Sequence, residues 1–170
     1  MLILGKSAHR LSIDIDVICP PGTNIEDYLK SFADFGFINL ELVERKQRDD
    51  ADIPKSHSKF FYQIAYRNDT DAQSYILLDV LYEDIHYFRT QQIAIDCPFI
   101  RLEGKPLMVT VPSAEDILGD KLTAFAPNTT GIPYYKNGRS CSMEIAKQLY
   151  DVGRLFENVS DLQITKEAFR

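Results

Sequence analysis

The sequence predicts one α/β (α+β) domain in which a mixed β-sheet is flanked by helices and followed by a helical C-terminal part. Strict alternation of polar and apolar residues over 12–18 is typical of a strand with one buried face. Two apolar runs, 60–66 and 75–82, are separated by turn-forming residues and predict a hairpin. Apolar residues at helical spacing over 113–125 and 142–156 predict helices that cover a sheet.

The first half of the chain alternates strands with breaks. Pro20-Pro21-Gly22 ends the first strand, and Thr23 with Glu26 forms a capping box for a helix that ends at Gly36. The charged stretch 45–58 predicts a mobile loop. Further short strands are predicted at 37–43, 93–95, 99–102 and 107–111.

The second half is expected to end in helices. Ser113 caps a helix that stops before Pro127, and a loop rich in glycine, asparagine, proline and tyrosine fills 127–140. Loops of this length are often functional or mobile. We therefore divide the chain into a core over 1–126 and a loop with a helical C-terminal segment over 127–170.

Composition and charge exclude several classes of protein. The 170 residues carry 19 Lys plus Arg against 25 Asp plus Glu, a formal charge of −6, which argues against a broad DNA-binding face. No apolar run approaches the length of about 18 residues that predicts a membrane span, and the N-terminus lacks a signal-peptide pattern. Three widely spaced cysteines without a CxxC pair fit a reducing compartment, so we expect a cytoplasmic protein.

Asp14 and Asp16 are the first candidates for chemistry. Side chains two positions apart on a strand point the same way, about 6.7 Å apart, so these carboxylates lie side by side while Ile13, Ile15 and Val17 face the core. Their repulsion at an effective dielectric constant of 20 is on the order of 2.5 kcal/mol. A wet edge strand tolerates such a pair, so the pair alone leaves the structural and the functional interpretation equally open.

Asp79 favours the functional interpretation. It lies in the almost unbroken apolar run 75–82, which predicts a strand buried on both faces, where a single ionised carboxylate is costly. Three carboxylates together would repel one another by about 7 kcal/mol, comparable with the stability of a whole domain. Two carboxylates from one strand and one from its neighbour are a ligand set for Mg²⁺ (or Mn²⁺) in nucleotidyl transfer. For Asp79 alone, a hydrogen-bonded core aspartate is the structural alternative.

Two charged residues lie on the predicted helices of the second half. Lys121 falls near the middle of the apolar stripe of its helix, where a lysine either extends to the edge of the core or meets an anion such as a triphosphate. Asp151 falls opposite the apolar stripe of the last long helix, four residues after Lys147, which predicts a solvated ion pair. That stripe comprises Ile145, Leu149, Val152 and Phe156.

Other polar groups give weaker signals. Lys136 and Arg139, beside Tyr134 and Tyr135, could contact phosphates and stack on a base, although such clusters are more often plain solvated loops. The three histidines show no metal-ligand spacing, so we interpret them as surface or core residues.

Three segments resemble a known family. The segment from Leu4 to Val17, LGKSAHRLSIDIDV, resembles the first motif of the AbiEii/AbiGii toxin family of nucleotidyltransferase-like proteins, GG(S/T)…(H/R)-R-x-S-x-D-I-D. The segment 113–122, SAEDILGDKL, resembles the lysine-bearing segment of that family, and 146–152, AKQLYDV, is similar to its R-D-x-x-D-L helix. The matches follow the family order and span most of the chain. The resemblance implies the fold of the polymerase-β-type nucleotidyltransferases.

The resemblance also implies roles for particular residues. The catalytic set that it implies is Asp14, Asp16, Asp79, Lys121 and Asp151. The first three aspartates would bind the metal, while Ser12 and Lys121 would contact the nucleotide. Members of the family transfer NMP from an NTP to an acceptor hydroxyl on RNA, a protein or a small molecule, as the toxin of a toxin–antitoxin or phage-defence pair. The expected partners are therefore an NTP, such an acceptor and an antitoxin protein, with no membrane.

The sequence departs from the family pattern at two places. Met1-Leu2-Ile3 stand where the family has its triphosphate-binding Gly-Gly-Ser/Thr, so we expect the strand and helix that carry this motif to be missing. Lys147-Gln148 replace the family's Arg-Asp. The alternative interpretation is a catalytically degenerate domain of the same fold that binds a nucleotide or a partner protein. A third and weaker interpretation is a metal-dependent nuclease with Glu44-Arg45-Lys46 as an E-x-K strand, because the residues that follow Val43 are polar and do not predict a strand.

Overall fold

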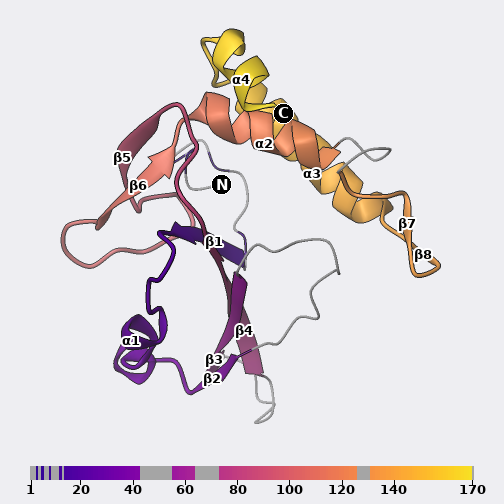
Figure 1. Cartoon of the computed structure of the whole chain (residues 1–170). Helices are drawn as coiled ribbons and strands as arrows, with labels where there is room; N and C mark the ends of the chain where they lie inside the picture. Colours follow the sequence, from indigo (N-terminus) through magenta and orange to yellow (C-terminus); the bar gives the residue numbers. More distant parts are fainter. Residues whose placement is uncertain are drawn as a thin grey trace. The chain divides into compact units, whose positions relative to one another are not determined.

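The computed structural model describes residues 14–42, 55–63, 73–125 and 131–169, together with Ile3, Gly5, Ala8 and Ser12 (Figure 1). The chain forms two compact units, which we call the sheet unit (Ser12–His86) and the helical unit (Met1–Leu11 with Tyr87–Arg170). This division does not coincide with the predicted boundary at residue 126, because helices on both sides of that residue pack against one another in the helical unit.

The sheet unit contains a four-stranded mixed sheet. Its strands, in order across the sheet, are β1 (Asp14–Cys19), β4 (Gln73–Tyr82), β3 (Lys55–Gln63) and β2 (Asn39–Leu42). β1 runs parallel to β4, whereas β3 is antiparallel to both β4 and β2. The predicted mixed sheet is confirmed, and so is the antiparallel pairing of the two long apolar strands. The loop predicted over 45–58 is wrong for 55–58, where β3 begins, and its other residues lie outside the described ones.

Two short helices stand where one longer helix was expected. They are α1 (Glu26–Leu29) and the 3₁₀ helix η2 (Phe32–Phe35). The predicted capping box is wrong, because the hydroxyl of Thr23 donates to the carbonyl of Pro20 at 2.8 Å and no side chain caps α1. Gly36 does end η2, with a φ of 84° that a residue without a Cβ adopts readily.

The helical unit joins a strand pair to three helices. These elements are β5 (Thr90–Ala94), β6 (Met108–Pro112), α2 (Ala114–Phe125), α3 (Ser142–Phe156) and α4 (Leu162–Ala168). β5 and β6 are antiparallel, and α2 packs against both α3 and α4 (Figure 1). The strand predicted over 99–102 is wrong, since that segment contains a turn and irregular backbone.

The core of the helical unit lies where α2 meets α3. Leu118 of α2 and Leu155 of α3 are completely buried and belong to one hydrophobic cluster with Ala8. As predicted, Ser113 caps α2, because its hydroxyl oxygen accepts the backbone N–H of Asp116 at 3.2 Å.

The predicted loop over 127–140 contains a small hairpin. β7 (Tyr135–Lys136) and β8 (Arg139–Ser140) are joined by Asn137 and Gly138, whose φ angles are 51° and 76°. Positive φ at both central residues is typical of the type I′ turn, for which Asn-Gly is the preferred dipeptide. The sequence therefore contained a signal for this hairpin that the loop interpretation missed.

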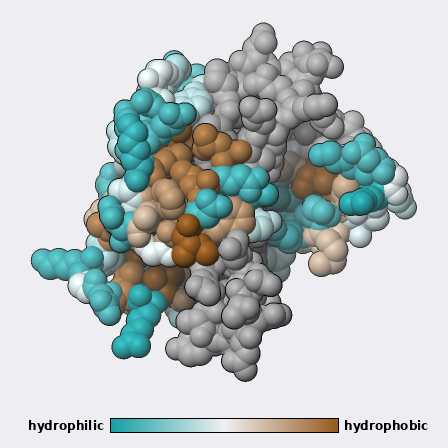
Figure 2. Space-filling model, turned by 90° about the horizontal axis from the view of Figure 1, so that it is seen from below, coloured by the Kyte–Doolittle hydropathy of each residue, from teal (hydrophilic) through white to brown (hydrophobic). Residues whose placement is uncertain are grey.

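Apolar side chains interrupt the hydrophilic surface of the described residues (Figure 2). Ile15, which the sequence assigns to the core, is 50% exposed. The reason is its place on β1, which is an edge strand of the four-stranded sheet. An alternating pattern identifies the strand and its two faces, but does not reveal how fully the apolar face is covered.

Candidate functional site

The sheet brings together the three aspartates that the sequence singled out. Asp14 and Asp16 lie on β1, and Asp79 lies on the adjacent β4. Asp16 is paired with Asp79 in the parallel register, and Asp14 is paired with Leu77. Neighbouring strands are about 4.8 Å apart and paired residues share a face, so the three aspartates lie on one face of the sheet. His57 of β3 is in register with Asp79 on the other side of β4.

The exposure of this face differs from the expectation. Of the described side chains of β4, only Val80 is buried, and Asp79 is half-buried, so the prediction of a strand buried on both faces is wrong. Asp14 and Asp16 are exposed. Water screens charges at such positions, so a repulsion of about 7 kcal/mol overestimates the cost of holding the three carboxylates together.

Ser12 lies at the start of the same strand. Its hydroxyl oxygen accepts the backbone N–H of Asp14 at 3.2 Å, which fixes the chain just before the first aspartate. This contact gives Ser12 a structural role in placing Asp14, independent of any contact with a nucleotide.

The chemistry of the donor set suits a hard cation. Mg²⁺ and Mn²⁺ prefer carboxylate oxygens, and three carboxylates share this face. Within the described ranges, no three Asp, Glu, His or Cys side chains are placed as a ready ligand set for a metal ion. The assignment of a metal to this face therefore rests on donor type and on the register of the backbone.

The two other predicted site residues form an ion pair in the helical unit. Nζ of Lys121 on α2 lies 3.5 Å from Oδ2 of Asp151 on α3. The Lys121 side chain is 30% exposed, and that of Asp151 is 1% exposed. Lys121 thus meets an anion, as one of its two interpretations required, and that anion is supplied by this chain.

The predicted position of Asp151 on a solvated helix face is wrong. Asp151 is buried beside Lys121, while Lys147, its expected partner, is exposed. Two residues of the expected apolar stripe, Leu149 and Phe156, are exposed instead. The residues of α3 that are at least partly buried are Ile145, Gln148, Asp151, Val152, Arg154 and Leu155. The packed face of α3 therefore overlaps the expected apolar stripe only in part, at Ile145 and Val152, and extends to the side that carries Asp151.

Gln148 lies one turn before Asp151 on this packed face. Its Oε1 is buried and accepts no hydrogen bond from the residues that the structure describes. Gln148 stands where the family motif has aspartate, so the chain keeps a carbonyl acceptor at that position and loses the charge.

A different buried carboxylate, Asp116, organises the start of α2. It accepts hydrogen bonds from the backbone N–H groups of Phe88 (2.9 Å) and Arg89 (3.1 Å) and from the hydroxyl of Ser113 (2.6 Å). Asp116 therefore ties the segment before β5 to α2, a role for which the sequence contains no local signal.

Two neighbouring carboxyl groups have shifted pKa values. Hydrogen bonds from Ser160 lower the pKa of Glu115, because the backbone N–H and the hydroxyl both donate to Oε1, at 3.0 and 3.2 Å. Partial removal from water raises the pKa of Asp120, and the hydrogen bond from the Tyr87 hydroxyl (2.9 Å) opposes this only in part. Both carboxyl groups accept hydrogen bonds that join separate segments of the helical unit, from Ser160 to Glu115 and from Tyr87 to Asp120.

The comparison with protein families identifies one match. The model described as "Nucleotidyl transferase AbiEii toxin, Type IV TA system" matches residues 1–170, which is the whole chain. Comparison with curated proteins and with solved structures gave no significant match. In the ranges that the structure describes, no helix has both the length and the apolar character that crossing a bilayer requires.

Proposed function

Because the chain belongs to the AbiEii nucleotidyl transferase toxin family of type IV toxin–antitoxin systems, we propose that it is a metal-dependent enzyme that transfers NMP from an NTP to an acceptor hydroxyl. The family implies a nucleotide substrate and an antitoxin partner. The acceptor that we propose is a hydroxyl of RNA, a protein or a small molecule.

One observation carries this proposal. Asp16 and Asp79 are directly paired on adjacent parallel strands, and Asp14 lies two residues from Asp16 on the same face. Three carboxylates on one sheet face provide the type of oxygen ligand that Mg²⁺ and Mn²⁺ prefer. A bound divalent cation would neutralise part of their charge.

Asp14, Asp16 and Asp79 are the residues that would hold Mg²⁺ or Mn²⁺. When bound, such a cation would act as a Lewis acid and stabilise the negative charge that develops during displacement. We also propose a second task for Asp79, the acceptance of a proton from the acceptor hydroxyl.

The proposed reaction is an in-line displacement. The acceptor oxygen forms a bond to the α-phosphorus while the bond from that phosphorus to pyrophosphate breaks, and the hydroxyl proton passes to Asp79. We assign Lys121 and Ser12 to nucleotide binding on the basis of the family motifs. Asp151 is then a positioning residue, because its buried carboxylate holds the ammonium of Lys121 at 3.5 Å.

The test is a transfer assay with NTPs labelled at the α-phosphate, combined with a measurement of pyrophosphate release. We expect activity that requires Mg²⁺ or Mn²⁺ and falls to the level of an EDTA control in Asp14→Asn, Asp16→Asn and Asp79→Asn. Asp34→Asn is the matched control, because Asp34 is an exposed aspartate of the same unit and outside the site. Equal loss of activity in Asp34→Asn, or transfer that persists in all three site variants, would contradict the assignment.

The same variants distinguish an active transferase from a catalytically degenerate domain that only binds a nucleotide. For the degenerate domain, calorimetric titration with each NTP and Mg²⁺ would show binding that depends on the three aspartates, without any release of pyrophosphate in the transfer assay. We also propose a cytoplasmic location, because three widely spaced cysteines without a CxxC pair fit a reducing compartment.

A further inference from the structure

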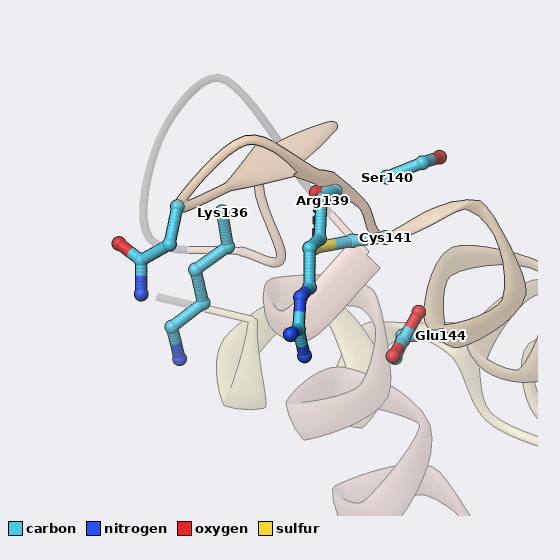
Figure 3. A pocket seen from close by; sticks show the side chains of 6 residues that line it. Lys136, Arg139, Ser140, Cys141 and Glu144 are labelled. Carbon is cyan, nitrogen blue, oxygen red and sulfur yellow. Dashed lines mark hydrogen bonds between the residues drawn. The ribbon is translucent and has the colours of Figure 1, made fainter.

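The β7–β8 hairpin holds two cations directly opposite each other. The Asn137-Gly138 turn sets the register, in which Tyr135 pairs with Ser140 and Lys136 pairs with Arg139. Directly paired residues of an antiparallel hairpin point to the same face with their Cβ atoms about 5 Å apart. Figure 3 shows the side chains of Lys136 and Arg139 extending in the same direction.

This pairing destabilises the free hairpin. Like charges that face each other across two strands repel, and the cost is largest where no acid neutralises them. Among the residues that the structure describes, neither Lys136 nor Arg139 forms an ion pair. An anion that contacts both cations would relieve the repulsion. The pairing of Lys136 with Arg139 therefore favours a negatively charged ligand.

A hollow accompanies the two cations. Its volume is about 510 Å³, and its lining residues are Lys136, Asn137, Arg139, Ser140, Cys141 and Glu144 (Figure 3). The Ser140 hydroxyl oxygen accepts the backbone N–H of Ser142 at 3.3 Å, and its side chain points away from Lys136 and Arg139, so these two cations are the donors that face the hollow together (Figure 3). Glu144 opposes an anion, but it lies in the first turn of α3, where the helix dipole offsets part of its charge. The lining keeps a net positive charge.

Aromatic side chains lie beside the cations. Tyr134 is 57% exposed and Tyr135 is 71% exposed. The ladder continues beyond β7, since the N–H of Cys141 donates to the carbonyl of Tyr134 at 2.9 Å, so Tyr134 lies on the same face as Lys136. Exposed rings next to cations provide stacking surfaces for bases and contacts for phosphates, the combination that binds single strands.

We propose that the β7–β8 hairpin is a binding site for single-stranded nucleic acid, in which Lys136 and Arg139 contact phosphates and Tyr134 stacks on a base. The formal charge of −6 repels a polyanion from most of the surface, which confines the contact to this hairpin. The site does not depend on the proposed transfer reaction, because none of its residues belongs to the proposed catalytic set.

The test is the binding of a fluorescein-labelled oligouridylate of about 12 nucleotides to the full chain, followed by anisotropy in EDTA without NTP. We expect Lys136→Gln/Arg139→Gln to weaken binding about tenfold. The slope of log K against log salt should fall by about 1.4, because each single-strand phosphate contact contributes about 0.7. Arg101→Gln/Lys105→Gln is the matched control, since it removes two exposed cations from the same unit outside the hairpin.

Two further variants separate binding from damage to the fold. Glu144→Gln removes the opposing charge and should raise the affinity about twofold or more, a gain that local unfolding would not produce. Tyr134→Leu should weaken binding at least about fivefold with little change in the salt slope, because stacking is not electrostatic.

Three results would overturn the proposal. The first is equal binding by the hairpin double variant and the control double variant. The second is weaker binding by Glu144→Gln. The third is displacement of the oligonucleotide by inorganic phosphate or an NTP at the same phosphate concentration, which would identify a free-phosphate site. The assay contains EDTA and no NTP, so it measures binding without transfer, and failure of the proposed transfer reaction leaves its result unaffected.

Discussion

Replacing Asp116 by Asn is expected to destabilise the helical unit by about 2–4 kcal/mol. Asp116 is 0% exposed, and its two carboxylate oxygens accept the N–H groups of Phe88 and Arg89 and the hydroxyl of Ser113. Asparagine has the same shape but only one acceptor oxygen, so one backbone N–H would lose its partner inside the protein. An unpaired buried donor costs about 1–3 kcal/mol, and the remaining bonds lose their charge-assisted character, at roughly 1 kcal/mol in total.

Urea denaturation followed by circular dichroism measures this change. Glu103→Gln is the control, because it removes one negative charge from an exposed position of the same unit. Ser113→Ala should cost about 1–2 kcal/mol, because it removes one donor to Asp116 and the N-cap acceptor of the Asp116 N–H but leaves the N–H groups of Phe88 and Arg89 paired. A free energy of unfolding for Asp116→Asn within about 0.5 kcal/mol of the control would refute the assignment of Asp116 as the tie between α2 and the segment before β5.

The other predictions concern the same unit. The contacts from Ser160 lower the pKa of Glu115 below its ordinary value of 4.5, so its stabilising contribution is present at neutral pH and is lost as the pH falls through the lowered pKa. Glu115→Gln should therefore reduce stability at pH 7 and show a smaller difference from the wild type near pH 3, measured by denaturation at both pH values. Gly119→Ala should destabilise by about 1–2 kcal/mol, because its Cβ would lie 2.6 Å from Cβ of Ala168 on α4. Gly153→Ala, with open space around the new Cβ, should instead stabilise α3 by up to about 1 kcal/mol, and the opposite order in thermal melts would contradict this packing.

The sequence predicted the elements whose signals are local. The bounds of α3, Ser142–Phe156, agree with the expected helix over 142–156, because its apolar residues recur at helical spacing and Cys141 precedes a run without Gly or Pro until Gly153. The alternation over 12–18 likewise identified β1 and placed Asp14 and Asp16 on one face. These features depend on residues only a few positions apart in the sequence, and a sequence pattern records interactions over that distance.

Features that depend on distant partners were not predictable in the same way. The face of α3 that packs is chosen by its contact with α2, about thirty residues earlier, where Lys121 offers a partner to Asp151. A helical wheel weighs apolarity alone and therefore placed Asp151 in solvent. Thr23 has a nearby carbonyl, that of Pro20, as a competing partner, and this interaction replaced the predicted capping box.

The two sets of proposed site residues are each formed by packing within one unit, and this has a measurable consequence. The strand register places Asp14, Asp16 and Asp79, while the α2–α3 contact places Lys121 and Asp151. Stability changes in Asp79→Asn and Lys121→Met should therefore add in the double variant, as they do for residues that share no partner. Their effects on transfer should not add if both sets serve one reaction, because removing one member of a catalytic group leaves little for a second change to remove. Additive losses of activity together with additive losses of stability would assign the two sets to separate tasks.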